Sequence, residues 1–243
     1  MSRRTKHKPK HTQDNQNIIN INEYIQRKNK VVLVPRNLNQ ETYITKLLDP
    51  SNVIVFGVGP AGTGKTMLAV LAAIKALKDG SINKIVITRP AVGVDDEKHG
   101  FLPGDLNSKM EPWTRPIFDV IQEYYGPKEI KTMIDESVIE ISPLAFMRGR
   151  TFKNAFIIAD EMQNATPNQM KMLLTRIGDE SRMAVTGDIQ QTDRQESQNG
   201  LINFGNLYYK YSQSQYIQFV KVQNTDIEIY PVVTEVLSIY GDK

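Results

Sequence analysis

The run that most constrains the fold of this chain is Gly-Pro-Ala-Gly-Thr-Gly-Lys-Thr at residues 59–66. It matches the pattern GxxxxGK(S/T) in full, with an apolar, β-rich run at Val53–Phe56 before it and apolar residues at helical spacing over Thr66–Lys78 after it. A strand, a glycine-rich loop and a helix in this order direct backbone N–H groups and a helix N-terminus toward an anion. The setting therefore predicts a phosphate-binding loop and disfavours the alternative, a glycine-rich turn that binds nothing.

The residues of this loop are expected to divide the work on a bound nucleotide. The glycines let the backbone wrap around phosphates, Lys65 would reach the β- and γ-phosphates, and the Thr66 hydroxyl would ligate Mg²⁺. The predicted cofactors are therefore ATP and Mg²⁺. The predicted nucleotide contacts come from the whole loop: Gly59, Pro60, Ala61, Gly62, Thr63, Gly64, Lys65 and Thr66.

Strand-like and helix-like segments alternate along the chain after Pro35. The expected strands are Val53–Phe56, Lys84–Thr88, Val138–Ile141, Ala155–Ala159, Met183–Thr186 and Tyr216–Val222. The expected helices are Asn39–Leu48, Thr66–Lys78, Trp113–Tyr125, Asn168–Ile177 and Val232–Tyr240. Several strands are near-continuous apolar runs, as in sheets that are covered on both faces. We predict an α/β fold, a single RecA-like P-loop NTPase domain with a mostly parallel sheet and helices on both faces.

The two ends of the chain differ in character. Residues 1–17 are polar, basic and aperiodic, which predicts a disordered basic tail before an ATPase domain over 18–243. The first twelve residues hold five Lys and Arg and no acid, whereas the rest holds 25 Lys and Arg against 27 Asp and Glu. The body is therefore not a basic nucleic-acid binder by composition. Residues 90–112 are rich in Gly and Pro and lack periodicity, so we expect a long functional loop there.

Composition also excludes several classes of protein. The longest apolar run, Met67 to Ile74, is far shorter than the roughly 18 residues of a membrane span, so no membrane association is expected. The absence of cysteine excludes disulfides and thiolate chemistry. The basic N-terminus leads into polar residues and resembles no signal peptide, which makes the cytoplasm the expected compartment.

A pair of acids follows the apolar strand Ala155–Ala159. Ligands bind α/β sheets at the carboxyl ends of the strands, which is where Asp160 and Glu161 lie. Asp160 is predicted to hold Mg²⁺, and Glu161 to orient and deprotonate the attacking water. The alternative is a solvent-exposed acidic turn, and the phosphate loop upstream favours the catalytic interpretation.

A third candidate element follows the strand Met183–Thr186, where the sequence reads Gly-Asp-Ile-Gln-Gln at 187–191. A neutral amide that faces the γ-phosphate can hold the water and sense whether the phosphate remains. We assign this role to Gln190.

With these three elements in order, the chain resembles the PhoH-like family, which is close to superfamily 1 helicases. The resemblance covers roughly Val34 to Tyr240. Its carriers are GPAGTGKT (59–66), TRPAV (88–92), GFLPGDL (100–106), PLAFMRGRTF (143–152), AFIIADEMQNATPNQMKMLLTRIG (155–178) and TGDIQQTD (186–193). It implies ATP binding and hydrolysis, hexameric rings and a link to RNA metabolism. Some members carry a fused PIN nuclease domain and unwind and cut RNA, and 243 residues leave no room for that domain.

The resemblance implies one further contact and contains one departure. Gln40 resembles the glutamine with which those helicases read adenine, since a side-chain amide can pair with adenine N6 and N7. Many relatives carry an Asp-Val-Val-Arg-His-Pro-like run near the C-terminus. Here residues 226–231 read Asp-Ile-Glu-Ile-Tyr-Pro, so any role of that arginine is absent or filled elsewhere.

A single domain leaves one side of the nucleotide open. Superfamily 1 helicases bind ATP between two domains, and a cation supplied in trans accelerates hydrolysis about 10³–10⁵-fold. We therefore expect a homo-oligomer, a hexamer by the resemblance, in which a neighbour supplies an arginine. Arg148 and Arg150, which flank Gly149, are the first candidates, and Arg176 and Arg182 follow. For each of them the alternative is an ordinary surface ion pair.

Three functions remain to be distinguished. The first is an ATP-driven motor that acts on single-stranded RNA, and its weakness is that no aromatic-basic stacking platform of the kind that grips single strands is visible in the sequence. The second is an ATP-switched adaptor that assembles a protein partner, such as a nuclease, without translocation. A P-loop kinase is disfavoured because a kinase needs no base for water and because no arginine-rich lid is evident.

Overall fold

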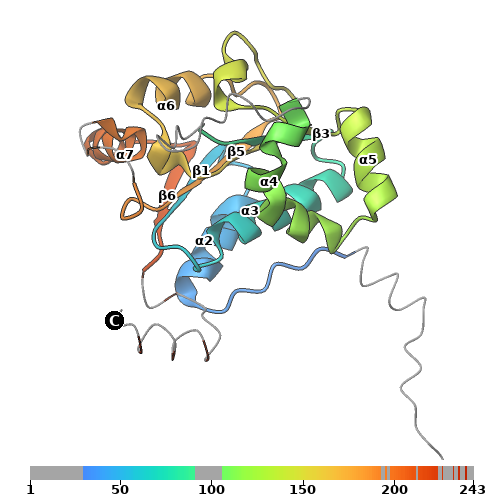
Figure 1. The fold of residues 1–243 in the computed structure, drawn as a ribbon. Helices are drawn as coiled ribbons and strands as arrows, with labels where there is room; N and C mark the ends of the chain where they lie inside the picture. Colours follow the sequence, from blue (N-terminus) through green and yellow to red (C-terminus); the bar gives the residue numbers. More distant parts are fainter. Residues whose placement is uncertain are drawn as a thin grey trace, which may run out of the picture.

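A computed structural model describes residues 30–90, 106–192, 195, 198–211, 213–223, 226, 232, 235 and 239, with backbone only over 106–112. Its centre is a six-stranded sheet in the order β3-β2-β4-β5-β1-β6 (Figure 1). The strands are β1 Ile54–Val58, β2 Lys84–Thr88, β3 Ile139–Ile141, β4 Ala155–Ala159, β5 Arg182–Gly187 and β6 Ile217–Lys221. Every pairing is parallel, which confirms the predicted α/β class.

The register of the sheet brings the predicted motifs together. Val58, the last residue of β1, lies opposite Gly187 of β5 and Lys221 of β6. Ala159, the last residue of β4, lies opposite Val185 of β5. Because all strands run the same way, the segments that follow β1, β4 and β5 leave the sheet at one edge. That edge is where an open parallel sheet binds its ligand.

Helices cover both faces of the sheet, as predicted. On one face lie α2 Leu38–Leu48, α3 Lys65–Lys78, α4 Leu106–Gln122 and α5 Pro127–Asp135. On the other lie α6 Pro167–Leu174, α7 Gly200–Tyr211 and the 3₁₀ turns η2 Leu144–Met147 and η3 Met162–Asn164. Alternate residues of each strand enter the two apolar cores, so that Val55 packs on the first face and Phe56 on the second. Burial of each such side chain contributes about 1.5–3 kcal/mol, which makes the sheet a rigid base for the loops at its edge.

The structure corrects the expected start of one helix. The predicted loop over 90–112 ends early, because α4 begins at Leu106 and not at Trp113, and it includes Pro112 and Pro116. Residues 91–105 lie outside the described chain. The proline cost in α4 is offset by packing, since Ile117 and Ile121 are 2% and 0% exposed against the first core.

Other boundaries differ for local reasons. Helix α6 starts at Pro167, because Thr166 and Gln169 form a capping box, and it stops at Leu174, since Ile177 pairs with Phe152 as an isolated bridge. Helices α5 and α7 were not predicted, and α7 contains two glycines, which weaken the helical signal. The predicted tail 1–17 lies outside the described residues, as does most of the predicted helix 232–240. No helix in the described part of the chain has the length and apolar character to span a bilayer.

Candidate active site

The loop between β1 and α3 requires glycine at two positions for different reasons. Gly59 has φ 153°, and a Cβ there would lie 2.2 Å from the carbonyl oxygen of Val222 after β6. Gly64 has φ 78° and is the N-cap of α3, so the helix begins from a left-handed residue. The backbone therefore turns sharply and presents the N-terminus of a 14-residue helix at the loop.

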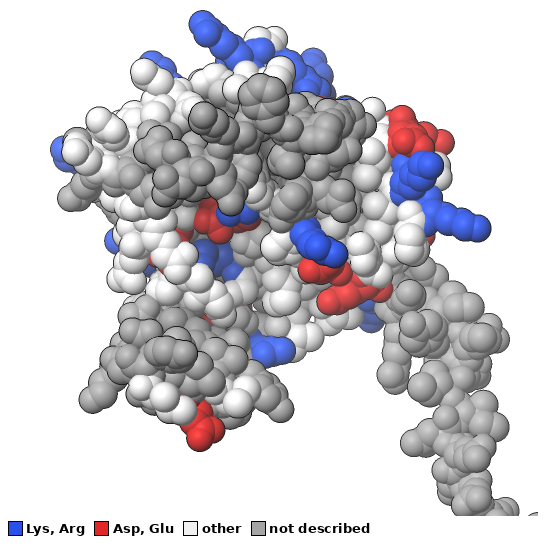
Figure 2. Space-filling model, viewed as in Figure 1, with Lys and Arg blue, Asp and Glu red and all other residues white. Residues whose placement is uncertain are grey.

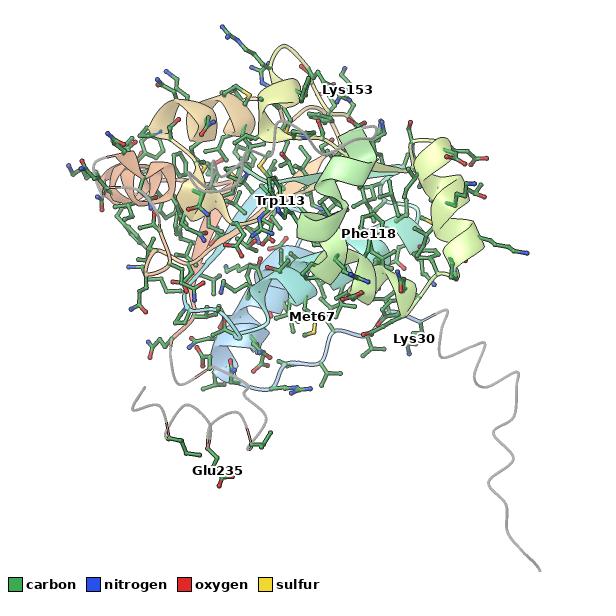
Figure 3. The ribbon with its side chains drawn as sticks, viewed as in Figure 1. Lys30, Met67, Trp113, Phe118, Lys153 and Glu235 are labelled. Atoms are coloured by element: carbon green, nitrogen blue, oxygen red, sulfur yellow. The ribbon has the colours of Figure 1, made fainter. Side chains whose placement is uncertain are left out.

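The loop forms one wall of a pocket of about 270 Å³ at the carboxyl edge of the sheet. The lining residues come from the loop, from the end of β4 and from the turn after β5: Ala61, Gly62, Gly64, Lys65, Thr66, Met67, Asp160, Glu161, Gly187, Asp188 and Gln191. In the view of Figure 2, acidic and basic side chains lie together near the middle of the molecule. Met67, labelled in Figure 3 at the start of α3, lines the pocket and remains 42% exposed. All three predicted motifs thus meet in one pocket.

Lys65 folds back into the loop. Its ammonium donates hydrogen bonds to the carbonyl of Pro60 and to Oγ1 of Thr63, the latter at 3.2 Å. Burial lowers the pKa of the Lys65 ammonium, although Asp188, Glu161 and Asp160 act in the opposite direction. Lys65 is only 7% exposed, so this cation is held with little water. A phosphate oxygen would replace the loop carbonyl as its partner.

Thr66 and Asp160, the two predicted magnesium ligands, are in contact. The Thr66 hydroxyl donates to Oδ1 of Asp160 at 2.8 Å, and the Thr186 hydroxyl donates to the same oxygen at 2.6 Å. Hydroxyl and carboxylate oxygens are the ligands that Mg²⁺ prefers, and this ion usually takes only one or two from protein beside phosphate and water. The donor set therefore fits Mg²⁺. The described residues contain no cluster of three or more His, Cys, Asp or Glu that could hold a metal without a nucleotide.

Glu161 is held on both oxygens. It has a positive φ of 54°, a conformation that costs a non-glycine residue energy and that is enriched at functional sites. One carboxylate oxygen accepts a hydrogen bond from the Gln163 amide, and the other lies 3.6 Å from Nη2 of Arg89. Arg89 follows β2 and also donates to the carbonyl of Trp113 on α4 at 3.0 Å. The predicted base is thus fixed in direction and is 35% exposed toward the pocket.

Gln163 links this base to the turn after β5. Its Oε1 accepts a hydrogen bond from the Asp188 N–H at 3.1 Å, and the Asp188 carboxylate accepts from the Ala61 N–H of the phosphate loop at 3.1 Å. Gln163 is 1% exposed, so both ends of its amide are occupied in a dry environment. Sequence reasoning missed Gln163, Arg89 and Thr186, because their roles arise only from contacts between neighbouring strand ends.

Comparisons with known proteins identify the family of this chain. The model of the family described as PhoH-like protein matches residues 32–241. This chain belongs to the PhoH-like family. A PhoH-like protein of Bacillus subtilis is 42% identical over 84% of this chain and 63% of its own length. Protein PhoH of Escherichia coli is 40% identical over 66% of this chain and 45% of its own length. Among solved structures, the Sulfolobus solfataricus SWI2/SNF2 ATPase core aligns with 82% of this chain and 49% of its own, at 12% identity and a TM-score of 0.44.

In this PhoH-like domain Gln191, and not Gln190, lines the pocket. The backbone turns between them, because the Gln191 N–H donates to the Asp188 carbonyl at 3.1 Å while the Gln190 N–H donates to the Asp188 carboxylate at 2.9 Å. The structure thus makes Gln191 the better-placed candidate for a water-facing amide, and the role of Gln190 stays a prediction. The signal was present in the sequence, since Gln191 is the fifth residue of Gly-Asp-x-x-Gln.

Gln40 lies against the phosphate loop but is 2% exposed. Its Nε2 donates to the Thr63 carbonyl at 3.1 Å, and its Oε1 accepts from the Arg36 N–H at 2.9 Å. One donor and one acceptor site of the amide remain, as a contact with adenine would need. Adenine reading by Gln40 stays a prediction.

The run that departs from the family pattern has a structural role at its first residue. Asp226 is buried and accepts hydrogen bonds from the Asn39 side chain at 2.6 Å and from the Gln223 N–H at 2.7 Å. These bonds tie α2 to the segment after β6. Residues 227–231 lie outside the described chain.

The four candidate arginines differ in what they contact. Arg150 forms an ion pair with Glu140, with Nη2 at 3.1 Å from Oε2, and stacks over Phe152 at 4.5 Å. Burial alone would raise the pKa of the Glu140 carboxyl, but hydrogen bonds from Arg150 and Lys84 lower it. Arg176 donates to the carbonyls of Met172 and Arg150, and Arg182 donates to the Leu47 carbonyl.

Arg148 differs from the other three. It is exposed, next to Gly149 with φ 78°, and makes no hydrogen bond or ion pair with any residue in the described ranges. Of the four candidates, Arg148 is therefore the one whose side chain is not engaged by another described residue.

Proposed function

We propose that this domain hydrolyses ATP to ADP and phosphate. One observation supports the proposal above all. The Glu161 carboxylate, held by Gln163 and Arg89, lines the same pocket as Lys65, Thr66 and Asp160. A base, a phosphate-binding cation and a hard-oxygen pair within one pocket are the parts that P-loop hydrolysis requires.

The residues would act in the following way. The loop N–H groups and Lys65 bind and orient the phosphates, and Thr66 with Asp160 would hold Mg²⁺, which neutralises charge that develops on the phosphate oxygens. Glu161 orients a water molecule for in-line attack and accepts its proton. Gln191 lies on the pocket wall where its amide can hold that water or detect loss of the γ-phosphate. Gln163 keeps Glu161 and the turn of Gln191 in fixed relation.

Assembly into a ring, a hexamer by the resemblance, completes the site in this proposal. Met67 and Glu161 in the pocket wall are 42% and 35% exposed, and Arg148 is exposed without a partner among the described residues. A subunit that presents Arg148 to its neighbour would supply the missing positive charge to the γ-phosphate. This chain spans 63% of the Bacillus subtilis relative, so the proposal concerns the domain common to both.

The substrate that we propose to couple to hydrolysis is single-stranded RNA, with the cytoplasm as the compartment. The family resemblance and the five basic residues among the first twelve support this choice. The second candidate is an ATP-switched adaptor that assembles a partner such as a nuclease. Arg148, which is exposed and has no partner among the described residues, is compatible with that function as well, because an arginine supplied by a neighbouring subunit requires assembly and does not require translocation.

ATP turnover with and without RNA separates the two functions. We expect hydrolysis by the wild-type chain, several-fold stimulation by a single-stranded RNA, and no turnover by Lys65→Ala as the control. ATPase activity that ignores RNA and DNA would favour the adaptor. If the folded wild-type protein has no affinity for Mg·ATP, the proposed function is wrong.

A further inference from the structure

One stretch of the chain has an unusual charge pattern. Residues 197–225 contain no Asp or Glu, although the whole chain has 27 acids in 243 residues. The same stretch holds two lysines, Lys210 and Lys221, and six of the 18 Tyr and Phe residues. Its described residues include α7, part of the connection to β6, and β6 itself, which is an outer strand of the sheet. Figure 1 shows α7 beside β6 at the left of the molecule.

Two aromatic rings of this stretch stack on a buried phenylalanine of the neighbouring strand β1. Phe219 of β6 stacks on the buried Phe56 of β1 at 4.2 Å between ring centroids, and Phe204 of α7 stacks on Phe56 at 5.2 Å. Phe219 in turn contacts Tyr208 at 5.0 Å and Tyr209 at 5.8 Å. Tyr208 and Tyr209 therefore pack on a layer of stacked phenylalanines, which holds the C-terminal part of α7 against β6.

Several side chains of the stretch remain exposed. Tyr209, Tyr211 and Tyr216 are 52%, 70% and 61% exposed, and Leu207 is 56% exposed. Lys221 lies over the Tyr209 ring, with Nζ 4.9 Å from its centroid. Neither Lys210 nor Lys221 forms an ion pair with a residue in the described part of the chain. Six residues form this α7–β6 surface: Leu207, Tyr209, Lys210, Tyr211, Tyr216 and Lys221.

A groove of about 720 Å³ adjoins this surface. Tyr211 and Tyr216 line it together with Gln213, Ser214 and Gln215, and apolar residues that include Ile54 complete it. The groove thus combines two aromatic side chains with side-chain amides and a hydroxyl that can form hydrogen bonds. Flat, polar-edged groups such as nucleobases match that combination.

We propose that the α7–β6 surface binds single-stranded RNA, by stacking bases on Tyr211 and Tyr216, which line the groove, while Lys210 and Lys221 face the phosphates. Aromatic rings beside cations, with no acid among them, are the features with which proteins hold single strands without reading sequence. An apolar protein partner would leave the tyrosine hydroxyls and the amides of the groove without hydrogen bonds. An acidic partner would pair with the lysines but would not use the aromatic rings. The proposal rests on the proposed coupling to RNA and assigns that RNA a place.

The position of this surface connects it to the nucleotide pocket. Strand β6 pairs with β1 directly before the phosphate loop, and the Val222 N–H donates to the Val58 carbonyl at 2.9 Å. At the other end, α7 begins at Gly200, whose N–H donates to the Ala165 carbonyl after η3 at 2.7 Å. A strand of RNA on this surface would therefore contact elements that lead to the phosphate loop and to the Gln163 turn.

The test is binding of a fluorescent single-stranded RNA, measured by anisotropy, for the wild type and for Tyr211→Ala/Tyr216→Ala. We expect the double variant to bind at least about tenfold more weakly, because each base stack on an aromatic ring contributes substantially to affinity. Tyr211→Phe/Tyr216→Phe should retain binding, since the ring faces remain. Single-stranded DNA should compete, because stacking does not involve the 2′-hydroxyl.

Controls separate the possible failures. Phe146→Ala removes an aromatic ring that is 62% exposed on η2, away from this surface, and should not change RNA affinity. Equal RNA binding by the wild type and the alanine double variant overturns the assigned surface and leaves the coupling to RNA intact. A wild type that hydrolyses ATP and binds no RNA overturns both. A double variant with altered subunit number and unchanged RNA affinity would identify the surface as a contact between copies, which also overturns the proposal.

Discussion

The nucleotide pocket and the α7–β6 surface lie on the same sheet and are built by opposite means. In the pocket, charged groups are buried and paired, as in the contacts of Lys65 with the loop and of Asp160 with two hydroxyls. On the α7–β6 surface, apolar rings are exposed and the lysines have no acidic partner among the described residues. Fixed partners in the pocket favour one ligand geometry, whereas the RNA that we propose for the α7–β6 surface would stack there without regard to its sequence.

The largest expected effect tests whether the pocket is complete within one subunit. Arg148→Ala should retain ATP binding and lower turnover about 10³-fold or more, because the charge on the γ-phosphate is no longer compensated. Arg150→Ala should affect mainly stability, since that arginine pairs with Glu140 within its own subunit. ATPase assays and nucleotide binding measure both.

Mixing variants sharpens this prediction. Subunits with Arg148→Ala and subunits with Glu161→Gln should regain activity together, because some interfaces then combine an intact base with an intact arginine. If Arg148→Ala alone hydrolyses ATP at the wild-type rate, Arg148 is not the trans arginine. If Arg150→Ala alone loses turnover, the assignment moves to Arg150.

The second prediction concerns the base in the pocket. Glu161→Gln should lower kcat about 10²–10⁴-fold and leave ATP affinity intact, because the phosphate loop is unchanged. The matched control is Glu180→Gln, since Glu180 also has a positive φ, 57° against 54°, and does not line this pocket. Single-turnover hydrolysis measures both variants. Comparable losses in the two would mean that a strained glutamate, and not a base, was removed.

The third prediction concerns the link between the base and the turn of Gln191. Gln163→Leu leaves Glu161 without its amide donor and the Asp188 N–H without its acceptor, so kcat should fall about tenfold while KM for ATP changes little. Gln169→Leu removes a different amide, that of the α6 capping box, and is expected to reduce only stability, by about 1 kcal/mol. Steady-state kinetics and thermal melts distinguish the two. If both variants lose kcat and stability together, Gln163 has a structural role and does not position the base.

The smallest effect tests the charge of the α7–β6 surface. Lys210→Gln/Lys221→Gln should make log affinity for single-stranded RNA less dependent on log salt, with a slope smaller by about 0.7 for each phosphate that is no longer neutralised. Basal ATPase activity should not change. The matched control is Lys131→Gln. Lys131 is exposed on α5, which packs on β3, the outer strand at the opposite end of the sheet from β6. An unchanged salt slope in the double variant would mean that these lysines do not face the RNA.

The residue pattern alone determined the parts of this protein that depend on fixed local spacing. The glycines and Lys65 of the loop, and the carboxylates that follow β4, were predicted because a short segment has one way to wrap a phosphate or to place an acid at a strand end. Strands β2 and β4 were predicted to the residue for a related reason, since a buried parallel strand is a continuous apolar run between polar ends.

The tertiary structure decided what depends on contacts between distant segments. Packing of Ile117 and Ile121 carried α4 across two prolines, and stacking on Phe56 supports α7, which contains glycines at 200 and 205. Gln163, Arg89 and Thr186 acquired roles because parallel strands end side by side. The exposed tyrosines on α7 and after it share a surface only once β6 has paired with β1. Local spacing fixes which atoms a short loop can present, but only the folded sheet determines which side chains become neighbours and which remain in solvent.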